Sequence, residues 1–132
     1  MSHQFPHLPT PVSIVIIDDD PITIFLAKKT LFNFDPEIII SSYNSGETAI
    51  KTLLKKDLVQ PHVILLDINM PRYNGWDFLN DYAKMQSGSK IFMFTSSVDP
   101  NDYIKSKTFE NVKGFISKPL DMLKIKNIFE SL

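Results

Sequence analysis

The sequence has no cysteine, no excess of basic charge and no long apolar run. Without cysteine, the chain has no disulfides, no thiolate metal ligands and no thiol nucleophile. The formal net charge of −1 leaves no basic excess to hold a polyanion. No apolar stretch approaches the roughly 18 residues that span a bilayer, and the first eleven residues lack the basic and apolar regions of a signal peptide. We therefore expect a cytoplasmic protein that binds neither nucleic acid nor membrane.

The composition is that of one globular domain. The chain has 132 residues, of which 43% are hydrophobic and 22% charged. Residues 1–11, which include three prolines, are expected to form a flexible leader before a folded domain at 12–132. Strands are predicted at residues 12–17, 37–42, 63–66, 91–94 and 114–116. Helices are predicted at 21–34, after Ser45, at 75–86, at 100–110 and after Pro119.

The alternation of strands and helices predicts an α/β fold. We expect a doubly wound, five-stranded parallel sheet with five helices, in the flavodoxin-like strand order 2-1-3-4-5. Asp20 and Pro21 supply an N-cap and a first helical residue. Apolar residues at helical spacing predict the buried faces. They are Ile22, Phe25, Leu26 and Phe32 in the first helix, Ala49, Ile50, Leu53 and Leu54 in the second, and Leu120, Leu123, Ile125, Ile128 and Phe129 in the last.

Polar residues follow four of the five predicted strands. Because the carboxyl ends of parallel strands meet at one edge of a sheet, these side chains should lie together there. The residues are Asp18, Asp19 and Asp20 after the first strand, Asp67 after the third, Thr95 and Ser96 after the fourth, and Lys118 after the fifth. Scattered surface charge rarely gives such an arrangement.

The acidic residues at this edge predict a cation site. Carboxylates held a few ångströms apart repel one another, and a divalent cation relieves that repulsion. An all-oxygen donor set selects Mg²⁺, Mn²⁺ or Ca²⁺, and the small number of protein ligands favours Mg²⁺, with Mn²⁺ possible. Helix capping alone would explain Asp20, and it is also an alternative explanation for Asp18 and Asp19.

A carboxylate beside such a cation is suited to phosphoryl chemistry. Asp67 is the candidate nucleophile, since aspartyl phosphates are known covalent intermediates. Phosphoryl transfer depends mainly on positioning and on neutralising charge, which Lys118 and the cation would provide. The Thr95 hydroxyl can donate to a phosphoryl oxygen. Taken alone, Thr95 could equally be a strand-end residue and Lys118 a solvated lysine.

Four segments carry a resemblance to a known family. They are IVIIDDDP (14–21), VILLDINMPRYNGWDFL (63–79), IFMFTSS (91–97) and GFISKPL (114–120). With these segments in this order, the chain from residue 12 to the last helix resembles the receiver domain of two-component response regulators.

The resemblance implies a role for each residue of the site. Asp67 corresponds to the phosphoacceptor, Asp19 to the acid that binds the metal directly, and Asp18 to its partner that reaches the ion through water. Asn69 stands where the family uses a backbone carbonyl as a metal ligand. Lys118 corresponds to the lysine that contacts the phosphoryl group, and its bond to Pro119 is usually cis in this family.

The resemblance also implies a switch. Thr95 corresponds to the hydroxyl that moves toward the phosphoryl group, and Phe115 to the aromatic residue that turns inward behind it. Ser96 occupies a position that must stay small, and Pro71 and Gly75 shape the loop after the phosphoacceptor. Phe115 departs from the family's usual tyrosine and so lacks a phenolic hydroxyl.

The function implied is that of a single-domain response regulator. A histidine kinase or histidine phosphotransferase would donate to Asp67 and use the first helix as its contact surface. Phosphorylation would switch the surface at 99–110, 113–116 and 120–128, which would bind a downstream protein or a second copy of the chain. Catalysis would be limited to phosphorylation and dephosphorylation of Asp67 itself.

Three other functions compete with this interpretation. A receiver-like module could act without phosphorylation, although the intact site disfavours this. A Mg²⁺-dependent phosphohydrolase of the haloacid-dehalogenase kind would need a second acid two residues after the nucleophile, where this chain has Asn69. A flavodoxin-like flavin site would need a phosphate-binding loop after the first strand, where three aspartates would repel phosphate.

Overall fold

The computed structural model describes residues 5–55 and 57–132. Its centre is a parallel sheet of five strands in the order β2-β1-β3-β4-β5. The strands are β1 (Ser13–Ile17), β2 (Ile39–Tyr43), β3 (Val63–Leu66), β4 (Lys90–Thr95) and β5 (Val112–Ser117). This order confirms the predicted doubly wound sheet.

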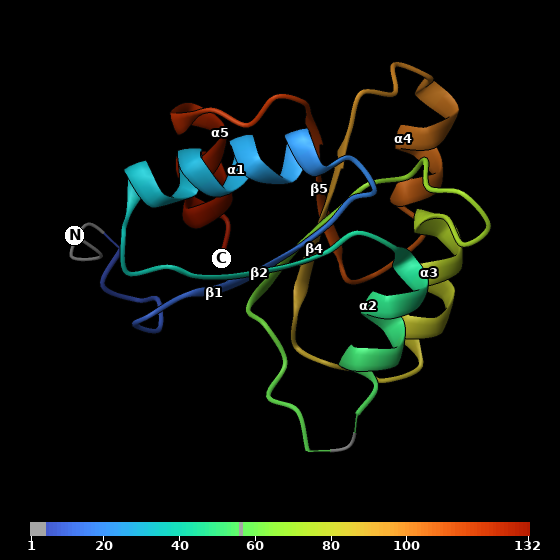
Figure 1. The fold of residues 1–132 in the computed structure, drawn as a ribbon, viewed down its shortest axis with the longest axis horizontal. Coiled ribbons are helices and arrows are strands. Elements are labelled where there is room, and N and C mark those ends of the chain that lie inside the picture. The colour runs from blue at the N-terminus through green and yellow to red at the C-terminus, as the bar shows by residue number, and fades with distance from the viewer. Residues whose placement is uncertain (1–4, 56) are drawn as a thin grey trace.

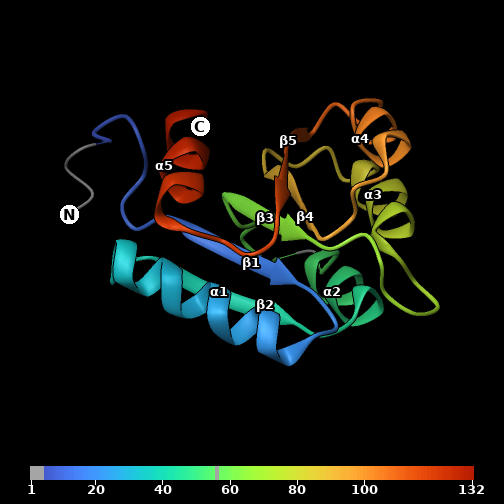
Figure 2. The ribbon, with the colours of Figure 1, turned by 90° about the horizontal axis from the view of Figure 1, so that it is seen from above.

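In the described part of the chain, five helices cover the two faces of the sheet (Figures 1 and 2). They are α1 (Pro21–Phe34), α2 (Gly46–Leu53), α3 (Gly75–Ala83), α4 (Pro100–Ser106) and α5 (Met122–Glu130). Figure 2 shows α1 and α5 on one side of the sheet and α2, α3 and α4 on the other. Several elements differ in length from their predicted ranges: α3 and α4 end earlier than expected, whereas β5 extends further at both ends.

Residues of the central strands divide between two hydrophobic clusters. Side chains alternate across a strand. Accordingly, Ile14 and Ile16 of β1 join the cluster under α1 and α5, while Val15 and Ile17 join the cluster under α2 and α3. All four residues of β3 are fully buried, as expected for the middle of a sheet that is covered on both faces. The middle strands therefore provide a rigid base for the residues at their carboxyl ends.

Local capping fixes where the helices begin. The Asp20 carboxylate accepts a hydrogen bond from the Ile22 N–H (2.9 Å), which confirms the predicted N-cap of α1. Asn74 and Asp77 form a reciprocal capping box at the start of α3. The chain therefore turns sharply into a helix soon after β1, and again at the end of the loop that follows β3.

The predicted buried face of α1 is wrong. Ile22, Phe25, Leu26 and Phe32 are 50–68% exposed, and the helix instead buries Ile24, Ala27 and Leu31. Apolar residues occur on more than one side of this helix, so spacing alone did not identify the side that packs on the sheet. Leu54 and Leu123 were likewise expected to be buried and are exposed.

Part of the expected leader is packed on the domain. Phe5 is only 7% exposed, and its ring contacts Phe129 of α5 edge to face at a centroid distance of 5.6 Å. Leu8 packs against the same cluster. Residues 1–4 of that segment lie outside the described residues. From residue 5 onward, the segment before β1 thus lies against α5, and its expected flexibility stays a prediction.

The helices of the described residues are short compared with a bilayer. Over residues 5–55 and 57–132, none is both long and apolar enough to cross a membrane.

Candidate functional site

Three carboxylates meet at the carboxyl edge of the sheet. Asp18 and Asp19 follow β1, and Asp67 follows β3, which is the neighbouring strand. One oxygen atom from each lies within 4.8 Å of the others. Asp18 is fully buried and Asp67 is 4% exposed, whereas Asp19 faces solvent. The predicted acidic cluster therefore forms, with one side open to water.

Lys118 brings a positive charge to these carboxylates. It follows β5, and its bond to Pro119 is cis, as the resemblance implied. Its Nζ atom lies 2.6 Å from Oδ2 of Asp18 and 3.6 Å from Oδ1 of Asp67. The Lys118 side chain is only 15% exposed, so these charges interact with little screening by water.

One ammonium does not neutralise the three carboxylates. Burial raises the pKa of Asp67 above its ordinary value, and the Asp18 carboxylate raises it further. The Lys118 ammonium and a hydrogen bond from the Asn69 N–H act in the opposite direction but do not cancel the increase. The ionised form of Asp67 is therefore less favourable in the folded protein alone than it is in water.

The donor set fits a divalent cation. Oδ1 of Asp18 accepts a hydrogen bond from the Asp20 N–H (2.9 Å), but Oδ2 is buried with no hydrogen-bond partner within the described part of the chain. Among the described residues, the one charged partner of that oxygen is the Lys118 ammonium, in an ion pair at 2.6 Å. Carboxylate oxygens beside an open side of a pocket match the ligands that hard cations prefer. The pocket formed by Asp18, Asp19 and Asp67 could therefore bind a metal ion.

Thr95 lies beside this pocket and is connected to α4. It ends β4, next to β3 in the sheet, and is fully buried. Its Oγ1 accepts a hydrogen bond from the Ser97 N–H (3.1 Å), and Ser97 Oγ donates to Asp102 of α4 (2.6 Å). Ser96 between them is exposed. A short path of hydrogen bonds therefore joins the Thr95 hydroxyl to the first turn of α4.

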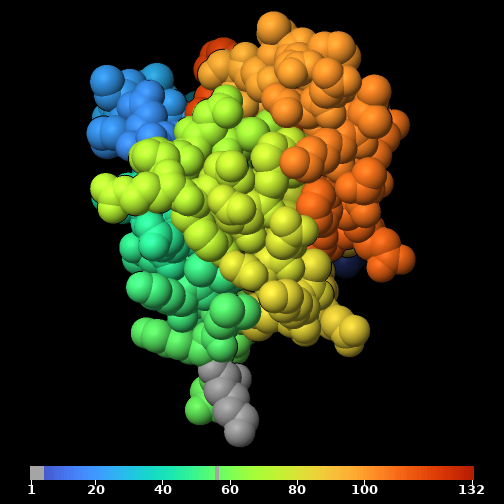
Figure 3. All heavy atoms as spheres, turned by 90° about the vertical axis from the view of Figure 1, so that its right-hand side faces the viewer, coloured from blue at the N-terminus to red at the C-terminus, as the bar shows by residue number. Residues whose placement is uncertain are grey.

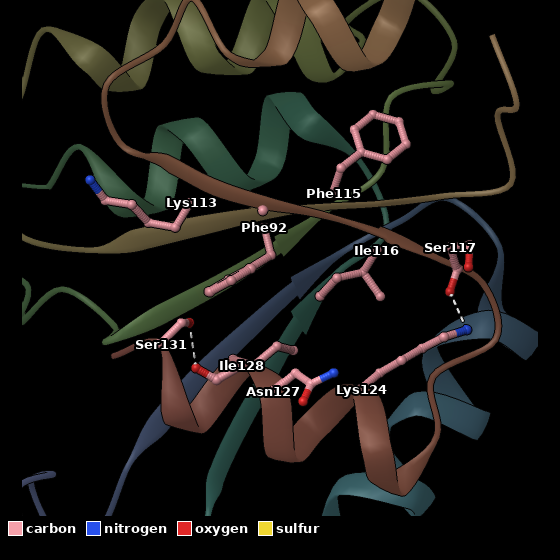
Figure 4. A pocket seen from close by; sticks show the side chains of 10 residues that line it. Phe92, Lys113, Phe115, Ile116, Ser117, Lys124, Asn127, Ile128 and Ser131 are labelled. Carbon is pink, nitrogen blue, oxygen red and sulfur yellow. Dashed lines mark hydrogen bonds between the residues drawn. The ribbon is translucent and has the colours of Figure 1, made fainter. Parts of the chain in front are cut away.

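Phe115 lies on the α4 side of β5. Its ring is partly buried and meets the ring of Tyr103 edge to face at 5.8 Å. Figure 4 shows this ring directed away from the groove between β5 and α5, where Ile116, Lys124 and Asn127 lie. In Figure 3, α4 and β5 form one continuous orange surface beside α3. Phe115, which was expected to act in the switch, thus lies at the surface formed by α4 and β5, whereas Thr95 is buried behind it in the sheet.

Comparison with known proteins identifies the family. The family model of the response regulator receiver domain matches residues 14–130. The chain belongs to this family. The match spans β1 to α5 and so includes every residue of the site.

Solved receiver structures have the same fold. A two-component response regulator from Cytophaga hutchinsonii aligns with a TM-score of 0.80 at 31% identity, over 89% of this chain and 93% of that one. A two-component response regulator from Legionella pneumophila aligns with a TM-score of 0.78 at 29% identity, over 92% and 99% of the two chains.

A curated relative is longer than this chain. The nitrate/nitrite response regulator protein NarL of Escherichia coli K12 is 30% identical over 118 residues, which cover 86% of this chain and 52% of NarL. The chain thus spans about half the length of the curated relatives that it matches.

The receiver's loop after Asp67 is closely packed at Gly75. A Cβ atom added there would lie 2.5 Å from the main-chain oxygen of Asp67 and 2.9 Å from Cα of Ile68. Both neighbours are backbone atoms, so the loop would have to shift. Pro71 lies in the same loop and is exposed.

We expect Gly75→Ala to lower the free energy of unfolding by about 1–3 kcal/mol through overpacking. The displaced Asp67 backbone should also slow phosphorylation at that residue. Urea unfolding and intact-mass measurement check these effects. Gly88→Ala is the matched control, because a Cβ at Gly88 meets nothing within 4 Å. Equal behaviour of the two variants would contradict the prediction.

Sequence reasoning gave no role to two residues that hold the receiver's loops. Tyr73 donates a hydrogen bond from its hydroxyl to the Asp81 carboxylate, which ties the β3–α3 loop to α3. Burial, and after it this bond to Asp81, raise the pKa of Tyr73. Lys124 of α5 binds main-chain oxygens on both sides of Lys118. Neither contact has a sequence signal, because each joins a loop to a helix residue through a particular side-chain orientation.

Proposed function

We propose that the chain is a Mg²⁺-dependent phosphoryl acceptor of a two-component system. Asp67 accepts the phosphoryl group from a phosphohistidine of a histidine kinase or histidine phosphotransferase. The observation that carries this proposal is the buried Asp67 carboxylate, which lies 3.6 Å from the Lys118 ammonium and next to two further acids. A structural ion pair would need only one carboxylate.

The chemistry is an in-line displacement at phosphorus. An Asp67 oxygen attacks the phosphorus atom, the bond from phosphorus to the imidazole nitrogen breaks, and the imidazole leaves with a proton from solvent. Asp18, Asp19, Asp67 and the Asn69 carbonyl would hold Mg²⁺ or Mn²⁺. When bound, the cation neutralises charge on the phosphoryl oxygens. Water later hydrolyses the acyl phosphate, so the only catalysis is that of the protein on itself.

Lys118 and Thr95 act on the phosphoryl group after it has arrived. The Lys118 ammonium pairs with one of its oxygens, and the Thr95 hydroxyl donates to another. Thr95 then gives up its bond from Ser97, which frees the loop before α4. Phe115 turns inward, and the surface of α4, β5 and α5 changes. That surface binds a downstream protein or a second copy of the chain.

Mass measurement after chemical phosphorylation tests the proposal. The protein is incubated with acetyl phosphate, with Mg²⁺ or with EDTA, and the intact mass is recorded. One Mg²⁺-dependent phosphoryl adduct that maps to Asp67 supports phosphoryl acceptance. Its absence would favour an interaction module that is not phosphorylated, and sustained hydrolysis of small phosphate esters would favour a phosphohydrolase.

The exposed apolar side of α1 is suited to contact the phosphoryl donor. Ile22, Phe25 and Leu26 lie exposed in the first two turns of the helix, directly after the acidic cluster. A donor seated on them would bring its phosphohistidine near Asp67. We propose this part of α1 as the donor contact.

Phe25→Ala is expected to slow phosphoryl transfer from a histidine phosphotransfer domain by about tenfold or more, as for a buried aromatic anchor of an interface. The rate with acetyl phosphate should stay unchanged, because the small molecule needs no docking surface. Phe32→Ala is the control, at an exposed aromatic residue in the last turn of the same helix. A parallel loss with both phosphoryl donors would contradict a docking role for Phe25.

A further inference from the structure

Lys124 binds the backbone on both sides of Lys118. From the first turn of α5, its Nζ atom donates to the main-chain oxygens of Ser117 (2.9 Å) and Pro119 (2.8 Å). Figure 4 shows the side chain extended along the groove toward Ser117. The Asp121 carboxylate is also close, at 3.9 Å. One ammonium thus connects α5 to the two residues that flank Lys118.

Lys118 itself is held at three points. Its N–H donates to the Thr95 main-chain oxygen (3.0 Å), and its ammonium reaches Asp18 and Asp67. Its long side chain can take up many conformations, so the direction of the ammonium depends on where the Cα atom is fixed. The carbonyl groups bound by Lys124 define the backbone on either side of that atom.

Helix stability does not account for the position of Lys124. A cation in the first turn of a helix opposes the helix dipole. The N-cap Asp121 accepts the Lys124 N–H (2.8 Å), a bond that any residue at this position could make. The side-chain ammonium therefore acts on the Lys118 loop rather than on its own helix.

We propose that Lys124 is a positioning residue for Lys118. It holds the 117–119 backbone so that the Lys118 ammonium meets Asp67 and, on the proposed function, the phosphoryl group. Two charge-assisted hydrogen bonds to oxygens that flank one residue restrict both its position and its tilt. Lys124 contacts neither Asp67 nor the cation pocket, so its effect passes through Lys118. The inference rests on the proposed function.

Lys124→Met tests this role, since methionine keeps the apolar stem but cannot bind the two carbonyls. We expect the rate of Asp67 phosphorylation by acetyl phosphate to fall by about tenfold, the effect of roughly one lost charge-assisted bond in the transition state. The Mg²⁺ concentration that gives half of the cation-induced rise in melting temperature should shift no further than it does in Lys118→Met, because no cation ligand changes and the variant acts only through Lys118. Lys124→Arg should recover much of the rate.

Lys51→Met is the matched control. Lys51 is an exposed lysine of α2, a helix outside the proposed contact surfaces, so its loss should leave the phosphorylation rate unchanged. If Lys51→Met slows phosphorylation as much as Lys124→Met, the effect is one of general surface charge and the proposal is wrong.

A double-mutant cycle separates positioning from general destabilisation. At saturating Mg²⁺, Lys124→Met should change the phosphorylation rate by less than about twofold when Lys118 is already methionine. A full tenfold loss in that background would overturn the proposal, and so would an unchanged rate in the single variant. If wild type itself forms no adduct, the proposed function fails. If instead the adduct forms at the same rate in wild type and in Lys124→Met, only the positioning role of Lys124 is rejected and the proposed function stands.

Discussion

Replacing Lys118 with methionine is expected to lower the free energy of unfolding by ~3–5 kcal/mol when no divalent cation is present, the usual effect of removing one partner from a buried ion pair. Asp18 is fully buried and lies 2.6 Å from the Lys118 ammonium, and Asp67 is nearly as well covered. The variant would leave both carboxylates without that charge. Urea unfolding in EDTA gives the measurement.

Divalent cation should reverse much of this loss. Mg²⁺ would take the place of the missing ammonium beside Asp18 and Asp67, so the cation-induced gain in stability should be larger in Lys118→Met than in wild type. Lys126→Met, at an exposed position of α5, should behave like wild type in both conditions. A Lys118→Met variant as stable as wild type in EDTA would show that the buried acids do not depend on this lysine.

The site was largely predictable because strand order alone brings its residues together. Asp18, Asp67 and Lys118 are far apart in the sequence, yet each follows a parallel strand and so reaches the same edge of the sheet. Only the strand pattern and the identity of the next polar residue were needed. The contacts of the Lys118 ammonium with Asp18 and Asp67 agree with this expectation.

The orientation of α1 could not be predicted in the same way. A sheet fixes its faces by strict alternation, whereas a helix with apolar residues on several sides can pack through any of them. The structure buries the side that contains Ala27, a small residue that lets the helix approach the sheet closely. Phe25 and Leu26 were therefore misassigned. The large apolar residues of that helix are therefore exposed rather than part of the core.

The loop contacts of Lys124 and Tyr73 could not be predicted from the sequence, for a different reason. Lys124 and Tyr73 act through the far ends of long side chains, and their partners are backbone or surface atoms of loops. No residue type is required at the partner position when the acceptor is a main-chain oxygen. Such contacts depend on loop conformation, which residue spacing does not specify.

Asp67→Asn is expected to abolish the phosphoryl adduct completely and yet to raise the free energy of unfolding at neutral pH without divalent cation. Asparagine has no carboxylate to attack phosphorus. It also removes a charge that the folded protein accommodates poorly, since burial and Asp18 raise the pKa of Asp67. Loss of function and gain of stability should thus occur in one variant.

The direction of the pKa shift predicts how the stability difference between wild type and Asp67→Asn depends on pH. Because the pKa of Asp67 is raised in the folded state, the folded protein binds that proton more tightly than the unfolded chain does. Below the ordinary pKa of aspartate, about 3.9, wild type and variant should be equally stable. Wild type should then lose stability relative to Asp67→Asn as the pH rises through the folded-state pKa.

Mg²⁺ should restore the stability of wild type. This response distinguishes charge repulsion at Asp67 from a simple packing effect. A cation at one hundred times its dissociation constant stabilises the folded state by about 2.7 kcal/mol, and Asp67→Asn should gain less because it lacks one ligand charge. The order of stability should therefore reverse when the cation is added at neutral pH. Thermal unfolding of both proteins, with Mg²⁺ or EDTA at several pH values, measures the pH dependence and the effect of the cation.

One result would contradict the electrostatic account of the pocket. If Asp67→Asn is less stable than wild type in EDTA at neutral pH, Asp67 contributes packing or hydrogen bonds that outweigh the unfavourable effect of its charge.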